Sequence, residues 1–281
     1  MLSYRHAFHA GNHADVLKHY VLASLIDYLN QKDKPYWYID THAGAGCYQL
    51  DAGYAAKNAE YTGGIARLWD RKDLPAALAS YVEQVKAMNA DGAMRLYPGS
   101  PLVAQPRLRA EDKLRLFELH PTDFPLLEEN LASAGRQAKL VKGDGFAGLK
   151  SLLPPAPRRA LTLIDPPYEE KKDYQRVVDT LADGLTRFAT GVYMVWYPLL
   201  QRSEPRLMIE QLKQLPVKGW LHASLTVHKP RSDGFGMHGS GLFILNPPWL
   251  LHEELQTTLP YLRDALALDA GASYQLEQQA S

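Results

Sequence analysis

The chain has 281 residues, of which 46% are apolar, so it can bury a real core as one large α/β domain or two small ones. Its 31 basic and 31 acidic residues cancel, which excludes the overall positive charge that announces a nucleic-acid binder. One cysteine excludes an internal disulfide, and no apolar run reaches the roughly 20 residues that a membrane span requires. Since the N-terminus also lacks the apolar segment of a signal peptide, we expect a cytoplasmic protein with no membrane contact.

The first predicted element is a helix over residues 15–30. Asn12 can cap its first turn, and Asp15 suits the positive end of the helix dipole. The segment DVLKHYVLASLIDYL then places its apolar residues on one stripe, as an amphipathic helix does.

Strands that alternate with helical patterns predict a mostly parallel, doubly wound sheet. The strands are expected at residues 36–40, 113–120, 137–144, 159–166 and 191–198. Residues 49–98 show helical periodicity without a clear strand, which predicts a helical subdomain inserted between residues 1–48 and 99–281. Near the C-terminus, WLHASLTVHKP and GSGLFILNPP are separated by a Gly-rich linker, so the last strands should pair antiparallel.

Three successive strand tips carry residues suited to an adenosine-containing ligand. DTHAGAG, which includes Gly44, follows the first strand, and its glycines allow a tight turn and close approach to a ligand. Glu118 ends the next strand, where a carboxylate can bind ribose hydroxyls, and Asp144 ends the third, where it can accept a hydrogen bond from an adenine amine. NAD fits less well than S-adenosylmethionine, because Gln49 replaces the third glycine of the pyrophosphate-binding fingerprint.

The fourth strand ends in LIDPPY, a motif suited to methylation of an exocyclic amine. The carboxylate of Asp165 and the carbonyl of Pro166 can each accept one N–H of the amine, and Asp165 can take the proton. Tyr168 offers a face on which a flipped-out base can stack.

A second stretch, ILNPPW, has nearly the same local pattern and could be interpreted in the same way. Ligands of a doubly wound sheet bind where the strand order reverses, between the first and the fourth strand. Because Asn246 ends the last strand instead, we expect ILNPPW to be a strand exit packed by Trp249.

The motifs DTHAGAG, FELHP, GDGF and DPPY, preceded by YRHAFHAGNHADVLKH, resemble those of the RlmJ family of bacterial 23S ribosomal RNA adenine-N6 methyltransferases. The likeness extends over essentially the whole chain. It implies a class I, Rossmann-like methyltransferase fold with a seven-stranded sheet and a small helical insertion. It also implies S-adenosylmethionine as the methyl donor and adenine 2030 of 23S ribosomal RNA as the acceptor.

The resemblance also assigns roles to individual residues. The donor-site residues that it implies are His19, His42, Ser100, Glu118, Asp144, Gly145 and Asp165. Tyr4 and Lys18 are implied on the substrate side, where Lys18 could contact a phosphate and Tyr4 the target base. A different interpretation of His19 is a surface ion pair with Asp15, four residues earlier.

Several alternatives stay open. DPPY does not distinguish adenine N6 from cytosine N4, or RNA from DNA, so a DNA amino-methyltransferase is a rival, as is a non-catalytic adenosine-nucleotide or RNA-binding protein. The N-terminal histidines match no standard zinc spacing, and we expect no metal. Lys229 and Arg231 lie either in an RNA-facing loop or in an ordinary exposed connection. We expect a monomer with no obligate protein partner.

Overall fold

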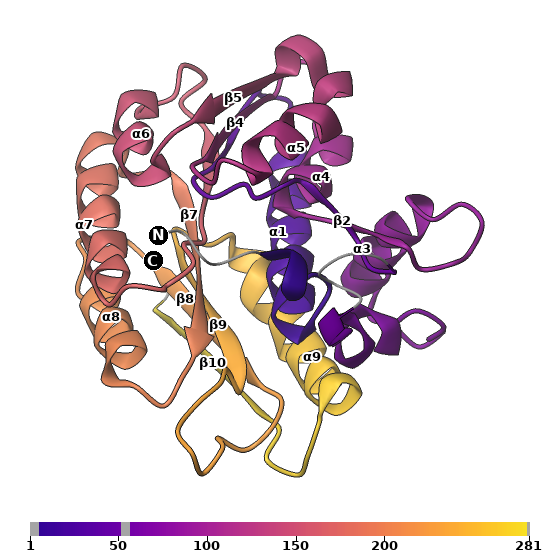
Figure 1. Cartoon of the computed structure of the whole chain (residues 1–281). Coiled ribbons are helices and arrows are strands. Elements are labelled where there is room, and N and C mark those ends of the chain that lie inside the picture. The colour runs from indigo at the N-terminus through magenta and orange to yellow at the C-terminus, as the bar shows by residue number, and fades with distance from the viewer. Residues whose placement is uncertain (1–5, 52–56, 280–281) are drawn as a thin grey trace.

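An eight-stranded sheet runs through the molecule in the order β10-β8-β9-β7-β6-β1-β4-β5 (Figure 1). The structure, a computed structural model, describes residues 6–51 and 57–279. The strands are β1 (Trp37–Asp40), β4 (Lys113–Glu118), β5 (Ala138–Lys142), β6 (Ala160–Ile164), β7 (Val192–Leu199), β8 (Trp220–Thr226), β9 (Gly239–Leu245) and β10 (Ser273–Gln279). Strands β5, β4, β1, β6 and β7 are parallel, whereas β9 is antiparallel to β7 and β8. The predicted mostly parallel Rossmann-like sheet with an antiparallel end is therefore confirmed.

The sheet has one strand more than the seven expected. The additional strand, β10, pairs antiparallel with β8 at the edge of the sheet. Only Leu276 of this strand packs against the core, and the residues beside it are exposed. A strand that buries so little has no alternation of apolar and polar residues to reveal it in the sequence.

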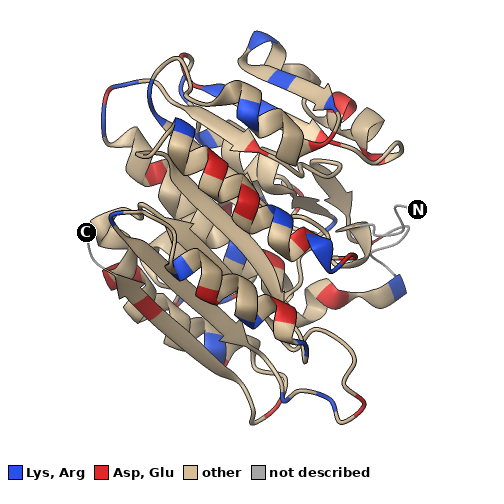
Figure 2. Ribbon diagram, turned by 90° about the vertical axis from the view of Figure 1, so that its left-hand side faces the viewer, with Lys and Arg blue, Asp and Glu red and all other residues tan. Residues whose placement is uncertain are grey.

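Helices cover both faces of the sheet. They are α1 (His13–Asn30), α3 (Ala76–Ala87), α4 (Ser100–Ala104), α5 (Asp123–Asn130), α6 (Gly145–Leu152), α7 (Lys172–Arg187), α8 (Ser203–Lys213) and α9 (Trp249–Leu266). Helices α1, α3 and α9 bury their apolar residues in one core cluster, and α6, α7 and α8 in the cluster on the opposite face (Figure 1). In Figure 2 the charged residues of both signs mingle on the outer surface of these elements. No helix within the described residues is both long and apolar enough to cross a bilayer.

The cap of α1 was predicted correctly, although the helix begins at His13, two residues before the predicted start. Asn12 Oδ1 accepts hydrogen bonds from the backbone N–H groups of Ala14 and Asp15, at 2.9 and 3.0 Å. This cap fixes the first turn of a helix that lies at the centre of the molecule, packed against the sheet.

The predicted insertion, residues 49–98, contains α3 and the short 3-10 turns η2 (Glu60–Gly63) and η3 (Ile65–Arg67). Contrary to expectation it ends in a strand, β3 (Leu96–Pro98), which pairs antiparallel with β2 (Cys47–Gln49). Three residues are too few to show strand periodicity in a sequence. Helix α3 packs on α1 within the same apolar cluster, and its separateness as a subdomain stays a prediction.

The strand order reverses beside β1, which pairs with β4 on one side and with β6 on the other. The loops that follow β1 and β6 therefore diverge, and a crevice forms at the carboxyl edge of the sheet. This is the position that the sequence predicted for DPPY.

Candidate active site

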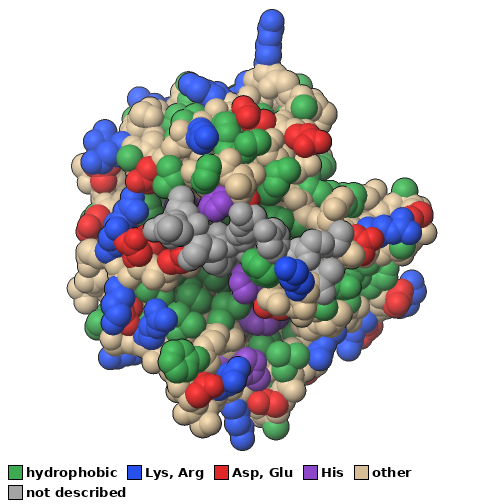
Figure 3. Space-filling view, viewed as in Figure 1, with side chains coloured by type: hydrophobic (Ala, Val, Ile, Leu, Met, Phe, Trp, Pro, Cys, Tyr) green, Lys and Arg blue, Asp and Glu red, His purple; other side chains and the backbone are tan. Residues whose placement is uncertain are grey.

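A cavity of about 290 Å³ opens where β6, β1, β4 and β5 end. The predicted site residues that line it are Lys18, His19, His42, Gly44, Ser100, Glu118, Asp144, Gly145, Asp165 and Pro166. Figure 3 shows this face of the molecule, where histidine side chains gather beside a hollow. Ten residues from six segments of the chain thus meet in one place.

Asp40, the last residue of β1, organises the loop beneath this cavity. Its buried carboxylate accepts hydrogen bonds from Ser100 Oγ at 2.6 Å, Tyr38 Oη at 2.8 Å and the His42 backbone N–H at 3.1 Å. Burial raises the pKa of Asp40, while these three donors oppose the rise. In the sequence Asp40 stands out only as the first residue of DTHAGAG, and its bond to Ser100 explains why the remote segment around Ser100 belongs to the site.

Glu118 and Gly44 are joined directly. Gly44 has a φ of +62°, and its N–H donates to Glu118 Oε2 at 2.7 Å, while the His120 N–H donates to Oε1 at 2.6 Å. Burial raises the pKa of Glu118, and these two backbone N–H groups oppose the rise. Each carboxylate oxygen keeps one lone pair, so Glu118 can accept hydrogen bonds from two ribose hydroxyls.

Both carboxylate oxygens of Asp144 already have partners within the protein, which the sequence did not suggest. Its Oδ1 caps α6 by accepting the Phe146 N–H at 3.0 Å, and its Oδ2 pairs with Arg176 Nη2 at 2.5 Å. The Arg176 guanidinium also lies over the Phe146 ring, 4.3 Å from its centre. An adenine amine would share Asp144 with Arg176, a residue that the sequence reasoning missed because it lies on α7, far from any motif.

Gly145 is required by the close approach of two loops. A Cβ atom there would lie 2.0 Å from the Thr41 carbonyl oxygen, a contact that only backbone movement could relieve. We expect Gly145→Ala to cost about 1–3 kcal/mol of unfolding free energy. Because the two loops carry His42 and Asp144, which line the cavity, it should also weaken binding of the S-adenosylmethionine that the sequence predicts, roughly tenfold or more.

Urea denaturation and calorimetric titration would measure both effects. Gly143→Ala is the matched control, because a Cβ at Gly143 would meet only Val141 Cγ1 at 3.8 Å. Equal affinity for S-adenosylmethionine in the two variants would contradict a role for the close packing at Gly145.

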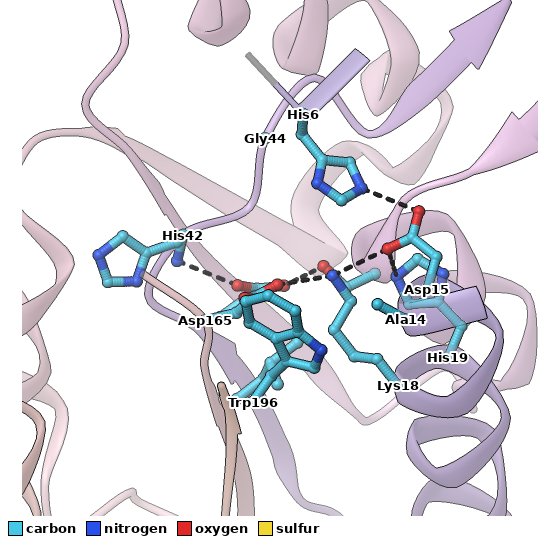
Figure 4. Close-up of polar contacts among 12 residues, drawn as sticks. His6, Ala14, Asp15, Lys18, His19, His42, Gly44, Asp165 and Trp196 are labelled. Carbon is cyan, nitrogen blue, oxygen red and sulfur yellow. Dashed lines mark hydrogen bonds and ion pairs between the residues drawn. The ribbon is translucent and has the colours of Figure 1, made fainter. Parts of the chain in front are cut away.

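The carboxylate of Asp165 ends a buried chain of charged groups (Figure 4). Lys18 Nζ donates to Asp165 Oδ2 at 2.6 Å and lies 3.1 Å from Asp15 Oδ1. Asp15 Oδ2 in turn accepts hydrogen bonds from His6 Nε2 and the Gly11 N–H, both at 2.9 Å. Burial by itself raises the pKa of Asp15, but His6, Lys18 and His19 outweigh it and hold that pKa well below its ordinary range.

This chain of charged groups bears on two interpretations drawn from the sequence. Lys18, predicted to contact a substrate phosphate, is almost fully buried, and its charge is shared by Asp15 and Asp165. His19 does not form a surface ion pair with Asp15, because both side chains are buried and Nε2 lies 3.9 Å from Asp15 Oδ1. The spacing of four residues correctly brought His19 near Asp15, but it could not show that the helix start faces the interior.

Tyr168 also differs from expectation. It has a φ of +51°, its ring is 4% exposed, and its hydroxyl donates to the Trp196 carbonyl oxygen at 2.7 Å. The ring packs against Tyr174, with centroids 4.6 Å apart, in the cluster under α7 and α8. Because it points into the core, Tyr168 does not offer a stacking face to the cavity; it anchors the DPPY loop to β7.

The motif ILNPPW lies at the opposite ends of the strands, away from the carboxyl ends where the cavity opens. Leu245 pairs with Tyr193 at the start of β7, whereas Asp165 follows the end of β6. Asn246 Nδ2 donates to the Ala189 and Gly191 carbonyl oxygens, each at 2.8 Å, which confirms a structural strand exit. Trp249 does not pack this exit as predicted, because its side chain is 75% exposed at the start of α9.

Tyr4 lies outside the described residues.

Two further histidines lie near the N-terminus. His9 pairs with Glu60 at 3.0 Å, and burial lowers the pKa of His13 to about 4. Over residues 6–51 and 57–279, no group of three or more histidine, cysteine or acidic side chains could hold a metal ion.

Comparison with known proteins decides the family. Residues 33–277 match the family described as ribosomal RNA large subunit methyltransferase D, RlmJ. The chain belongs to the RlmJ family. The ribosomal RNA large subunit methyltransferase J of Escherichia coli is 51% identical over 266 residues, which cover 95% of this chain and 94% of that protein. The protein of the same name from Haemophilus influenzae is 44% identical and covers 99% and 98%.

A crystal structure of a Legionella pneumophila protein has the same fold, with a TM-score of 0.88 at 35% identity. It covers 95% of this chain and 97% of that one. The RlmJ family match begins at residue 33, after α1, whereas the two RlmJ relatives align over nearly the whole chain. The Lys18–Asp165 pair therefore joins a residue outside the family match to one within it.

Proposed function

We propose that this protein transfers a methyl group from S-adenosylmethionine to the exocyclic N6 of one adenine in 23S ribosomal RNA, by resemblance adenine 2030. Membership of the RlmJ family supports methyl transfer to large-subunit ribosomal RNA, which is the activity that both relatives carry in their names. The observation that carries the proposal is the meeting of Asp165 with Glu118 and Asp144 in one cavity.

The residues that line the cavity fit S-adenosylmethionine, which supplies an electrophilic methyl group on a sulfonium sulfur. Glu118 would hold the ribose hydroxyls and Asp144 the adenine amine, where Gly44 and Gly145 allow the backbone to come close. The remaining donor-site residues in this proposal are His19, His42 and Ser100, which lie along the same cavity.

Asp165 would act on the adenine amine, a poor nucleophile because its lone pair is delocalised into the ring. Lys18 occupies Oδ2, and no described residue donates a hydrogen bond to Oδ1, so that oxygen can accept one N–H. The Pro166 carbonyl would accept the other, which aims the lone pair at the methyl group. Bound S-adenosylmethionine would supply the methyl group and leave as the neutral thioether, and Asp165 would take the proton that leaves N6.

Tyr168 holds the DPPY loop in shape in this mechanism rather than stacking on the base. The proposed acceptor implies that the protein works in the cytoplasm, where ribosomal RNA is found. We further propose that it acts as a monomer with no obligate protein partner, and that Tyr4 borders the target base.

Radiolabelled S-adenosylmethionine tests the proposal. Purified protein should label unmodified 23S ribosomal RNA at N6-methyladenine and should leave duplex DNA unlabelled. Label on DNA but not on RNA would instead establish a DNA amino-methyltransferase, and donor binding without transfer to either would establish a non-catalytic sensor.

A further inference from the structure

Two buried tyrosines of the inserted segment, residues 49–98, lie next to the proposed methyl-donor site. Tyr81 on α3 and Tyr97 on β3 are fully buried, and their hydroxyl oxygens lie 2.7 Å apart. The Tyr97 hydroxyl is also 2.9 Å from Nδ1 of His19, which is itself 1% exposed. These contacts form one hydrogen-bonded chain of three groups, shielded from water, that ends at a cavity-lining histidine.

The direction of this chain follows from counting hydrogens. Each hydroxyl has one hydrogen to donate, and within the described residues Tyr97 is the sole polar partner of the Tyr81 hydroxyl. If His19 Nδ1–H donated to Tyr97 and Tyr97 to Tyr81, the hydrogen of Tyr81 would be buried without an acceptor. If Tyr81 donates to Tyr97 and Tyr97 to Nδ1, both buried hydroxyl hydrogens have an acceptor, and the His19 proton lies on the ring nitrogen that faces away from the tyrosines. The second direction is favoured, because a buried donor without a partner is costly.

This direction fixes the protonation of His19. Burial lowers the pKa of His19 to about 3, so the ring is neutral near pH 7 and carries one proton. With Nδ1 acting as an acceptor, that proton lies on Nε2. Nε2 is 3.9 Å from Asp15 Oδ1, beyond hydrogen-bonding distance, and therefore keeps its hydrogen for a ligand.

We propose that Tyr97, a residue of the inserted segment, is a positioning residue that holds His19 as an Nε2–H donor toward the carboxylate of the methyl donor. The inference rests on the proposed function, in which Glu118 and Asp144 hold ribose and adenine and the sulfonium faces Asp165. The amino-acid end of the donor then lies on the α1 side of the cavity, beside His19 and Ser100. A carboxylate is the strongest acceptor at that end, and a neutral Nε2–H matches it.

Nuclear magnetic resonance on protein labelled with ¹⁵N-histidine tests the tautomer without any ligand. The long-range ¹H–¹⁵N correlations of His19, assigned with His19→Gln, should show the proton on Nε2 in the wild type. In Tyr97→Phe the tautomers should mix, and the Kd for S-adenosylmethionine should rise about fivefold, the value of one hydrogen bond of ordinary strength.

Tyr193→Phe is the matched control. It removes a buried hydroxyl with two backbone acceptors, the Gly184 and Phe188 carbonyl oxygens, on the opposite face of the sheet. This variant should keep the wild-type tautomer and Kd. A proton on Nδ1 in the wild type, or an unchanged tautomer and Kd in Tyr97→Phe, would overturn the inference. Wild-type protein with the Nε2–H tautomer that bound no S-adenosylmethionine would overturn the proposed function and leave the assignment of His19 standing.

Discussion

Replacing Asp165 by alanine is expected to slow methyl transfer to ribosomal RNA about a thousandfold, within the range found for a lost general base. The variant loses the acceptor that aims the amine and the group that takes its proton. Donor binding should fall far less than the rate, because Glu118, Asp144 and Gly44 remain in place. Single-turnover assays with labelled donor, alongside calorimetric binding, would separate the two effects.

The twin motif supplies the control for this experiment. Asn246→Ala removes an analogous side chain before two prolines, but its amide only satisfies the carbonyls of Ala189 and Gly191. It should therefore cost about 1–3 kcal/mol of stability and leave the rate of transfer unchanged. An active Asp165→Ala protein, or a folded but inactive Asn246→Ala protein, would show that the chemistry has been assigned to the wrong motif.

Replacing Lys18 by methionine should lower stability by about 3 kcal/mol at neutral pH and also reduce methyl transfer. Lys18 is the cation between two carboxylates, and methionine would remove that cation while leaving Asp15 buried beside His6. The loss should be visible as a lower midpoint in urea unfolding. A Lys18→Met protein as stable as the wild type would contradict the charge balance described for Asp15, Lys18 and Asp165.

The pH dependence of that loss identifies Asp15. In the wild type the pKa of Asp15 is held below its ordinary value, so its contribution to stability is present above about pH 4 and is lost only in stronger acid. Without Lys18, burial should raise this pKa above the ordinary value, so the variant loses stability as pH rises through it. The difference between wild type and variant should therefore shrink toward pH 4 and grow toward pH 7.

A double variant separates the charge from the packing. Lys18→Met combined with Asp15→Asn removes both partners, and we expect it to recover much of the lost stability and to abolish the pH-dependent difference. If the double variant were as unstable as the sum of the two single variants, the loss would come from packing of the lysine stem rather than from the buried charge.

Much of the architecture could be predicted because its signals are local. Asn12 caps α1 through its own side chain, and buried parallel strands are continuous apolar runs. Asp165 follows such a run, whereas Glu118 ends and Asp144 follows a strand with polar residues in it. Parallel strands bring their carboxyl ends to one edge, so the meeting of these three residues in one cavity was expected. The edge strand β10 and the three-residue β3 escaped prediction because neither buries enough residues to produce a period.

The sequence by itself thus determined the class of fold, the order of the strand tips and the preference for DPPY over NPPW. Only the tertiary structure decided which way side chains point: Tyr168 turns into the core, Lys18 joins Asp15 to Asp165, and Tyr97 reaches His19. The two kinds of information differ for a physical reason. Helix capping and apolar periodicity act between neighbours along the chain, whereas the buried charge and hydroxyls named above are satisfied by partners 28 to 147 residues away.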